Sequence, residues 1–503
     1  MKVQNRLPQL RHGRLLSDPS VPLLITGLLW FSSPYHVEPS QVVAAFLLVY
    51  IPWVLYCRWR HTDKQEFPLL PFILAMYWLA YALPLFWSGR EVTSYRGSHS
   101  LSDVGITKSM YLAVDGAAAV FLGAILSRRI RWSPTASIDI PPCRSHRRYL
   151  GIVLISGLLL RISLPIGEVG SGARQILSNV ETIVPSVAFG LLFRYWLRRE
   201  ATRWEQLLVV VYLCGSVILG IASGWLGSVV AISIVCAAMY AYEQRKLPIV
   251  ALVIILPVVL FFQPAKEGFR QRYWYSGGSA TVGERLWFWV GDSWQMWSQA
   301  LDDPGSESIK ALANQSLGRL SLLQQTANVI ELTPEVVPYQ YFRLYSYLGV
   351  TFIPRFFWQD KPSVNDANIW YQVSYRITPP QGLQGVSVAV GTLTESYISF
   401  GWFGPLLIMV PLGMLLALFQ RFFLAGDRGL VFSTLGAVLI PQFLAIESQL
   451  AQYLSGLVQQ IAVALLVLLP VLRVYQSTRA GLNLSGTFRF VRSKPRISAA
   501  ANT

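Results

Sequence analysis

The sequence predicts an all-α polytopic membrane protein with about 12 transmembrane helices and one large loop. Hydrophobic residues make up 53% of the 503 residues and charged residues only 14%, whereas ordinary globular proteins have roughly 25% charged residues. Several apolar runs reach the ~20 residues that cross a bilayer. The basic residues also gather on one side of the topology that these runs define. A soluble enzyme, a disordered chain and a secreted disulfide scaffold are therefore excluded.

The predicted spans divide the chain unevenly. They lie near residues 20–36, 41–57, 68–88, 109–127, 149–166, 181–197, 206–222, 225–242, 247–263, 402–422, 430–446 and 452–472. We therefore predict four regions. These are a nine-span region over 1–263, a large loop with a re-entrant end over 264–400, a three-span region over 401–472 and a basic tail over 473–503.

The basic residues predict the orientation of these spans. If the N-terminus is cytoplasmic, the cytoplasmic segments hold 27 of the 42 lysines and arginines and the short outer loops hold four. This asymmetry follows the positive-inside rule, so both termini are expected in the cytoplasm and the loop over 264–400 outside it. The net charge of +16 then reflects topology and contact with anionic lipid headgroups, and no nucleic-acid partner is expected.

The loop over 264–400 carries 7 of the 17 tryptophans and is nearly neutral. Leucines and other apolar residues at helical spacing predict a helix over about 311–331. The prolines that follow, from Pro334 to Pro380, predict an irregular stretch. A loop of this length is usually functional or disordered, and its aromatic content favours an ordered one.

Residues 386–422 are almost continuously apolar and admit two topologies. A separate span over Val386–Phe400 would move the basic tail to the outside, which the positive-inside rule disfavours. We therefore interpret Gly391–Phe400 as a re-entrant or interfacial piece that borders a polar cavity.

Away from the span ends, the charged residues Asp115 and Arg161 fall inside predicted spans. Both lie roughly 8–9 Å below the outer surface, at 1.5 Å per residue. One interpretation is a buried ion pair without catalytic duty. The other is that Arg161 faces a polar cavity and binds substrate.

Cations also gather in the long loop on the outer side. The cations of the long loop are Lys266, Arg270, Arg272, Arg355 and Lys361. Because arginine grips phosphate through two arms and lysine offers a point charge, this set could clamp a membrane-bound pyrophosphate. The alternative is solvated or snorkelling charge near headgroups. The aromatic residues likewise fit either sugar stacking or an interfacial belt.

Two motifs carry a family resemblance. The run Phe352-Ile353-Pro354-Arg355-Phe356-Phe357-Trp358-Gln359-Asp360-Lys361-Pro362 resembles the "IPR…W…KP" signature of bacterial O-antigen and exopolysaccharide polymerases, the Wzy family. The run Gly391-x3-Glu395-x-Tyr397-x2-Phe400-Gly401-x2-Gly404 and the Arg270/Arg272 stretch are similar to the same family. Elsewhere only the number of spans and the large outer loop agree.

The resemblance implies a GT-C-like glycosyltransferase of the bacterial inner membrane whose active site faces the periplasm. It would transfer a growing glycan from undecaprenyl pyrophosphate to a new lipid-linked repeat unit, beside a flippase and a chain-length regulator. Arg355, Arg270 and Arg272 would bind pyrophosphate with support from Lys361. Glu395 would be the base or acceptor anchor, or would instead brace the re-entrant piece by pairing with Arg355. Asn365, Asp366 and Tyr397 would hydrogen-bond sugar.

Three rivals are weaker on the sequence. An O-antigen ligase relies on a histidine in its large loop, and none of the five histidines lies in 264–400. Protein-glycosylating GT-C enzymes place acidic residues in a large first outer loop, which here has only Glu38. A flippase or transporter of lipid-linked sugars usually shows two repeated halves. Because the small first outer loop lacks an acidic cluster, we expect no metal, and we expect no cofactor.

Overall fold

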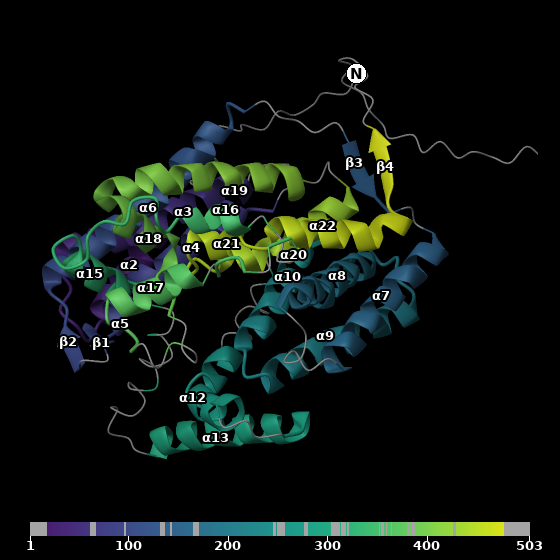
Figure 1. Ribbon diagram of the computed structural model, residues 1–503, viewed down its shortest axis with the longest axis horizontal. Helices are drawn as coiled ribbons and strands as arrows, with labels where there is room; N and C mark the ends of the chain where they lie inside the picture. Colours follow the sequence, from purple (N-terminus) through teal and green to yellow (C-terminus); the bar gives the residue numbers. More distant parts are fainter. Residues whose placement is uncertain are drawn as a thin grey trace, which may run out of the picture.

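A computed structural model of the chain describes most of its residues (Figure 1). The described residues are 18–60, 67–94, 97–130, 136–140, 143–163, 171–244, 257–275, 280–302, 321–351, 360–363, 365–379, 388–425 and 429–476, with isolated positions at 248, 312, 318, 353, 357, 358 and 383.

The protein is a mostly helical membrane protein. In the described part, eight helices are long and apolar enough to cross a membrane. They are α3 (Pro39–Arg60), the continuous α4 (Leu69–Tyr77), η1 (Trp78–Ala82) and α5 (Leu83–Trp87), α6 (Asp103–Ser127), the Val180–Leu197 part of α8 (Ser171–Leu197), α9 (Arg203–Ala222), α10 (Leu226–Gln244), the continuous η5 (Pro405–Met409) and α19 (Val410–Phe423), and the stretch of α21 (Leu450–Leu454), α22 (Leu457–Leu468) and η7 (Leu469–Val471). Each of the eight coincides with a predicted span.

The other four predicted spans have different outcomes. Two correspond to shorter apolar helices, α2 (Ser20–Phe31) and α20 (Leu430–Leu444). The span over 149–166 corresponds to α7 (Arg144–Ser163), whose first turns carry several basic residues. The span over 247–263 lies mostly outside the described residues. The count of twelve therefore stays a prediction.

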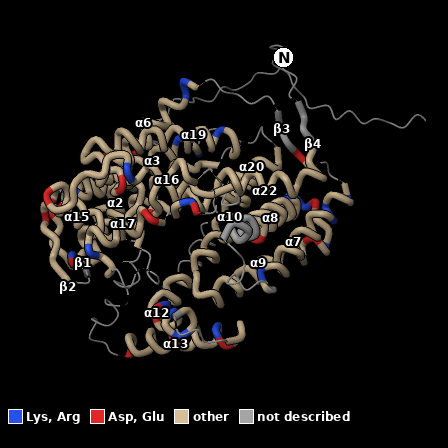
Figure 2. The backbone as a smooth tube through the Cα atoms, viewed as in Figure 1, with Lys and Arg blue, Asp and Glu red and all other residues tan. Residues whose placement is uncertain are grey.

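The helices form one large buried core with a smaller cluster beside it. In the large core, α6 and α19 pack backbone against backbone, because Gly123 faces Val410 and Gly413 faces Val120. Small residues allow this close approach of helices in membranes. Figure 2 shows that α20 and α22 carry no charge along their length, as expected for helices within a bilayer.

In its described part, the long loop forms several helices, all of ten residues or fewer except one, which has 21. These are α12 (Lys266–Arg270), η2 (Gln271–Tyr275), α13 (Val282–Asp302), α15 (Leu323–Leu332), α16 (Ser346–Thr351), α17 (Asp366–Ser374) and α18 (Gly391–Phe400). The helix expected over 311–331 is confirmed where α15 covers it, from Leu323 onward, but Ser321 and Leu322 are not helical. Most of 311–320 lies outside the described residues, so that part stays a prediction. The irregular stretch expected after Pro334 was also only partly right, since α16 and α17 interrupt it.

These helices lie in two places. Figure 1 shows α12 and α13 below α9, apart from the group of α15, α16, α17 and α18. Within the smaller cluster, Trp289 of α13 donates its indole N–H to the carbonyl of Phe262 over 3.0 Å. By contrast, α15 sits against the large core, where Ser109 of α6 donates to the Leu323 carbonyl over 3.2 Å.

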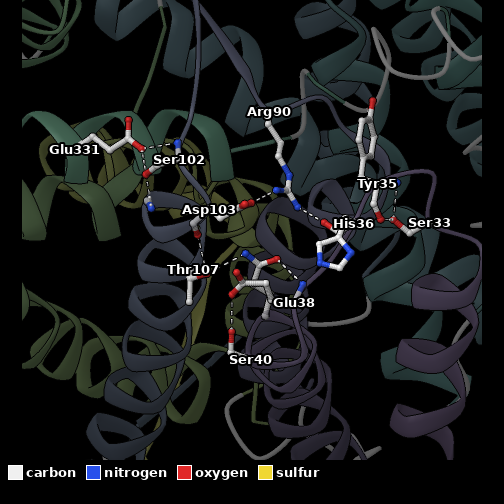
Figure 3. A network of polar contacts seen from close by, with 12 residues as sticks. Ser33, Tyr35, His36, Glu38, Ser40, Arg90, Ser102, Asp103, Thr107 and Glu331 are labelled. Carbon is white, nitrogen blue, oxygen red and sulfur yellow. Dashed lines mark hydrogen bonds and ion pairs between the residues drawn. The ribbon is translucent and has the colours of Figure 1, made fainter.

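A polar network ties α15 to the ends of α3, α5 and α6 (Figure 3). Ser102 is the N-cap of α6 and accepts from the Gly105 N–H over 2.9 Å. Glu331 of α15 accepts from the Ser102 N–H over 2.8 Å, so a carboxylate lies at the positive end of the α6 dipole. Arg90 pairs with Asp103 and donates to the His36 carbonyl. The long loop is thus anchored to the first spans.

Two small antiparallel ribbons depart from the all-α prediction. One pairs β1 (Glu91–Ser94) with β2 (Gly97–Ser100), in register Glu91 to Ser100. The other pairs β3 (Ala136–Asp139) with β4 (Arg473–Gln476) and joins two segments that are far apart in the sequence. Each strand has four residues, so the fold class stays helical.

Candidate active site

The short helix α18 is polar and nevertheless buried. Its ten residues read GTLTESYISF, and all from Gly391 to Ser399 are buried. Ten residues are too few to cross a bilayer, which needs about 20. The interpretation of this segment as a piece that does not span, rather than a thirteenth span, therefore fits its length. A buried polar helix of this kind requires hydrogen-bond partners for its side chains.

Glu395 is the central residue of α18 and has no exposed surface. Its Oε2 accepts a hydrogen bond from the Leu450 N–H over 2.7 Å, at the start of α21. Within the described part of the chain its Oε1 has no hydrogen-bond partner. Complete burial raises the pKa of Glu395 from 4.5 to about 8, although the bond from Leu450 opposes the rise. The carboxyl is therefore mostly protonated at neutral pH.

Other buried polar groups lie on elements that contact α18 or neighbour it. Tyr345 lies close enough that the charge of Glu395 raises its pKa, after the larger effect of burial. Gln449 precedes Leu450, and both of its amide atoms are buried without a partner among the described residues. The same holds for both amide atoms of Asn328 on α15 and for the Tyr371 hydroxyl on α17. Unsatisfied buried groups are costly, so this cluster is suited to hold water or hydroxyl-rich ligands.

Asn365 connects α17 to the same short helix that Glu395 binds. Its Oδ1 accepts from Gln452 of α21 over 3.1 Å and from Asn368 over 3.3 Å. Asp366 accepts from the Ser363 N–H over 3.0 Å, which fixes the first turn of α17. Asn365 and Glu395 therefore bind two nearby residues of α21, Gln452 and Leu450.

Tyr397 points elsewhere. Two residues along a helix differ by about 200° in direction, so Tyr397 cannot share the face of Glu395. Its ring packs edge-on against Trp402 at 5.7 Å and Tyr339 at 6.5 Å between centroids. Burial and the neighbouring Tyr339 raise the pKa of Tyr397 to about 12.

The glycines of the second motif shape the end of α18. Gly401 ends the helix with φ of 61°, a conformation that side chains with a Cβ rarely adopt. At Gly404, an added Cβ would strike the Ser396 carbonyl and lie 3.0 Å from the Tyr397 nitrogen. The motif therefore lets the chain turn sharply and run back against α18.

Lys361 is buried, and its amine donates to the carbonyls of Val350 over 3.2 Å and Ile353 over 2.7 Å. These carbonyls lie at the end of α16 and just beyond it, and α16 packs against α21. Lys361 thus braces the segment that leads to Arg355. Arg355 itself lies outside the described residues.

Arg270 and Arg272 pack against aromatic rings of the α12–α13 cluster, while Lys266, at the start of α12, acts electrostatically on Glu447 just before α21. The Arg270 guanidinium lies 4.5 Å from the Trp274 ring, and that of Arg272 lies 4.8 Å from the Phe288 ring. Such cation–π contacts hold arginines over aromatic faces. No described contact joins either arginine to α18, α21 or Glu395.

Arg161 and Asp115 also lie apart. Among the described residues they form no ion pair, so that interpretation of the two charges was wrong. Asp115 is exposed on the surface of α6. Arg161 lines a cavity between α7, α8, α9, α10, α20 and α22. In the described part, no cluster of three or more His, Cys, Asp or Glu could hold a metal.

The comparison with protein families gives one match. A family model described as "Domain of unknown function (DUF8712)" matches residues 99–422, more than half of the chain. The chain belongs to this family. No curated protein and no solved structure matches the chain. The DUF8712 region runs from the start of α6 to the end of α19, so it includes Glu395 and its motif, whereas the partner helix α21 lies beyond it.

Several buried polar residues on the elements around α18 were not predicted from the sequence. Asn328, Tyr345, Tyr371 and Gln449 were not singled out. A usable signal was present for Gln449, because an amide between Glu447 and an apolar span is unusual at a membrane. The others stand in segments of mixed polarity, where only the tertiary fold shows that they are buried.

Proposed function

We propose that the chain is a GT-C-like membrane glycosyltransferase that polymerises undecaprenyl-pyrophosphate-linked oligosaccharide repeat units. It transfers the growing glycan to the non-reducing end of a new lipid-linked repeat, in O-antigen or exopolysaccharide biosynthesis. One observation carries the proposal. Glu395 stands in a motif similar to the Wzy family, is fully buried, and keeps one carboxylate oxygen without a partner among the described residues.

The chemistry follows from that carboxylate. Glu395 accepts the proton of the acceptor hydroxyl, whose oxygen attacks the anomeric carbon of the growing glycan. The bond from that carbon to the pyrophosphate oxygen breaks, and the undecaprenyl pyrophosphate leaves with the electron pair. A base whose pKa lies near the working pH is effective in such a step, and the pKa of about 8 supports this role.

Cations stabilise the charge that develops on the departing pyrophosphate. Arg355 is the first candidate, because it lies four residues beyond α16, which packs against α21. Four residues span at most about 14 Å, so Arg355 stays within reach of the Glu395 site. Lys361 supports Arg355 by binding the backbone carbonyls of Val350 and Ile353, which precede Arg355 in the chain.

The remaining residues have separate tasks. Asn365 and Asp366 bind sugar hydroxyls at the start of α17, and Tyr397 does so from the other face of α18. Arg270 and Arg272 bind a second pyrophosphate or steer the lipid-linked substrate, since they lie in another cluster. Arg161 binds substrate within the helices.

The proposal places the protein in the bacterial inner membrane, with both termini cytoplasmic and the site open to the periplasm. A flippase would supply the repeat units, and a chain-length regulator would limit the product. Neither the ligase nor the flippase interpretation gains a specific observation from the fold.

The test is reconstitution of the full chain with lipid-linked repeat units of its host. A ladder of longer lipid-linked glycans is expected. Transfer of glycan to lipid A would assign a ligase instead, and movement across the bilayer without new linkages would assign a flippase. Either result would overturn the proposal.

A further inference from the structure

A cavity of about 260 Å³ lies among the helices, at a place separate from α18. Its polar wall comes from Arg161 of α7, Tyr212 of α9, Ser228 of α10, Gln442 of α20 and Gln460 of α22. Tyr212 stands near the middle of the spanning helix α9. The cavity is therefore at membrane depth and not in a surface loop.

The charge of Arg161 is not balanced by a direct partner. Among the described residues it makes no hydrogen bond and no ion pair within 4.0 Å. Glu181 and Tyr212 are its electrostatic neighbours. A guanidinium at this depth is costly to maintain without a close anion, and such residues mark functional sites. The wall also holds the Gln460 Oε1, which is buried without a partner in the part of the chain described.

The remaining wall is apolar and suits a hydrocarbon chain. Ile232, Val438 and Leu439 line it and are buried. Thr182, also in the lining, is exposed on the outer surface of α8. A ligand could thus place an anionic head against Arg161 and leave its chain along apolar surface toward the lipid.

We propose that this cavity binds a lipid-borne phosphate, with Arg161 donating to the phosphate oxygens and Tyr212 completing the site. The inference rests on the proposed function, which gives Arg161 to substrate binding, but its test measures ligand binding and no glycan transfer. The cavity is connected to the α18 site through Gln442. The Nε2 of Gln442 donates to the carbonyls of Tyr453 over 2.8 Å and Ser455 over 3.0 Å. These residues end and follow α21, whose first N–H binds Glu395. One short helix therefore separates the two sites.

Binding of farnesyl phosphate to the purified full chain in detergent tests the proposal, with farnesol and inorganic phosphate as the comparison ligands. We expect farnesyl phosphate to bind at least tenfold more tightly than either. The Arg161→Gln variant should lose at least tenfold in affinity for farnesyl phosphate, whereas Arg129→Gln, which removes an exposed arginine at the end of α6, should lose none. Glu395→Gln should bind normally, which separates this site from the proposed reaction.

A second variant tests the same cavity in case Arg161→Gln does not fold. Ala231→Leu fills the cavity and keeps the charge, so it should weaken binding of farnesyl phosphate while the protein elutes as wild type in size-exclusion chromatography. Equal affinity of wild type and Arg161→Gln for farnesyl phosphate would overturn the proposal. So would farnesol binding as tightly as farnesyl phosphate. Inorganic phosphate binding as tightly as farnesyl phosphate would assign the cavity to a free anion and overturn the lipid part.

Discussion

At the scale of single residues, Glu395 combines an anchoring contact with an available oxygen. Its Oε2 holds the start of α21, while its Oε1 has no partner among the described residues. The expected contact between Glu395 and Arg355 is not tested, since Arg355 lies outside the described residues. The sequence indicated Glu395 through its motif, but the contact with Leu450 joins residues 55 positions apart and has no signature in the sequence.

The pKa of Glu395 predicts how stability depends on pH. The folded carboxyl keeps its proton up to about pH 8, whereas the unfolded carboxyl loses it near 4.5. The unfolded state then binds fewer protons between these values, so the free energy of unfolding falls as pH rises through this window, by up to about 1.4 kcal/mol per pH unit. Thermal unfolding in detergent from pH 5 to 9 measures this. Glu395→Gln should flatten the dependence, and an unchanged slope in that variant would contradict the assignment.

Arg355 gives a prediction about charge and shape. If it grips pyrophosphate through both arms of its guanidinium, a lysine cannot replace it. We expect Arg355→Lys to keep normal membrane levels but to lose most polymerisation, with Arg355→Ala no more than slightly worse. Polymer analysis by gel and immunoblotting of membranes measure both quantities. Polymer of normal amount and length from Arg355→Lys cells would show that Arg355 does not bind pyrophosphate in this way.

At the scale of elements, long apolar helices were predictable and short ones were less so. Eight predicted spans coincide with helices because their length and composition are decided locally. The break before α15 was not predicted, since it depends on η1, where the Leu322 N–H donates to the Ala80 carbonyl over 3.0 Å. The packing of Arg270 on Trp274 was also not predicted, because spacing along the chain does not tell which side chains a short helix meets.

The turn after α18 gives a prediction about folding. Gly404→Val should disrupt the packing of the chain against Ser396 and lower the amount of folded protein, because a side chain there meets backbone that cannot move aside. Gly349→Val is the matched control, since nothing lies within 4 Å of the position of its Cβ. Size-exclusion profiles of the detergent-solubilised proteins compare them. A monodisperse Gly404→Val protein at wild-type yield would refute the close packing.

At the scale of the whole molecule, the orientation in the membrane is the main prediction. Cys143 is exposed, and its hydrogen bonds with Ser145 lower the pKa of its thiol, which favours reaction with maleimides. Phe342 on the long loop is 73% exposed. In intact cells, an impermeant maleimide should label Phe342→Cys in a chain without the native cysteines, and should not label Cys143 in the native chain. The reverse pattern would invert the topology and remove the site from the periplasm.

The most direct measurement is the rate of glycan extension by the purified chain in proteoliposomes supplied with lipid-linked repeat units. The account predicts a ladder of lipid-linked products from the wild type. It predicts a rate roughly 10²–10⁴ lower for Glu395→Gln, the usual contribution of a positioned base, at an unchanged yield of folded protein. Glu335→Gln, which changes an exposed carboxylate just after α15, should extend glycan at the wild-type rate. A Glu395→Gln protein that makes the ladder as fast as wild type would contradict the account.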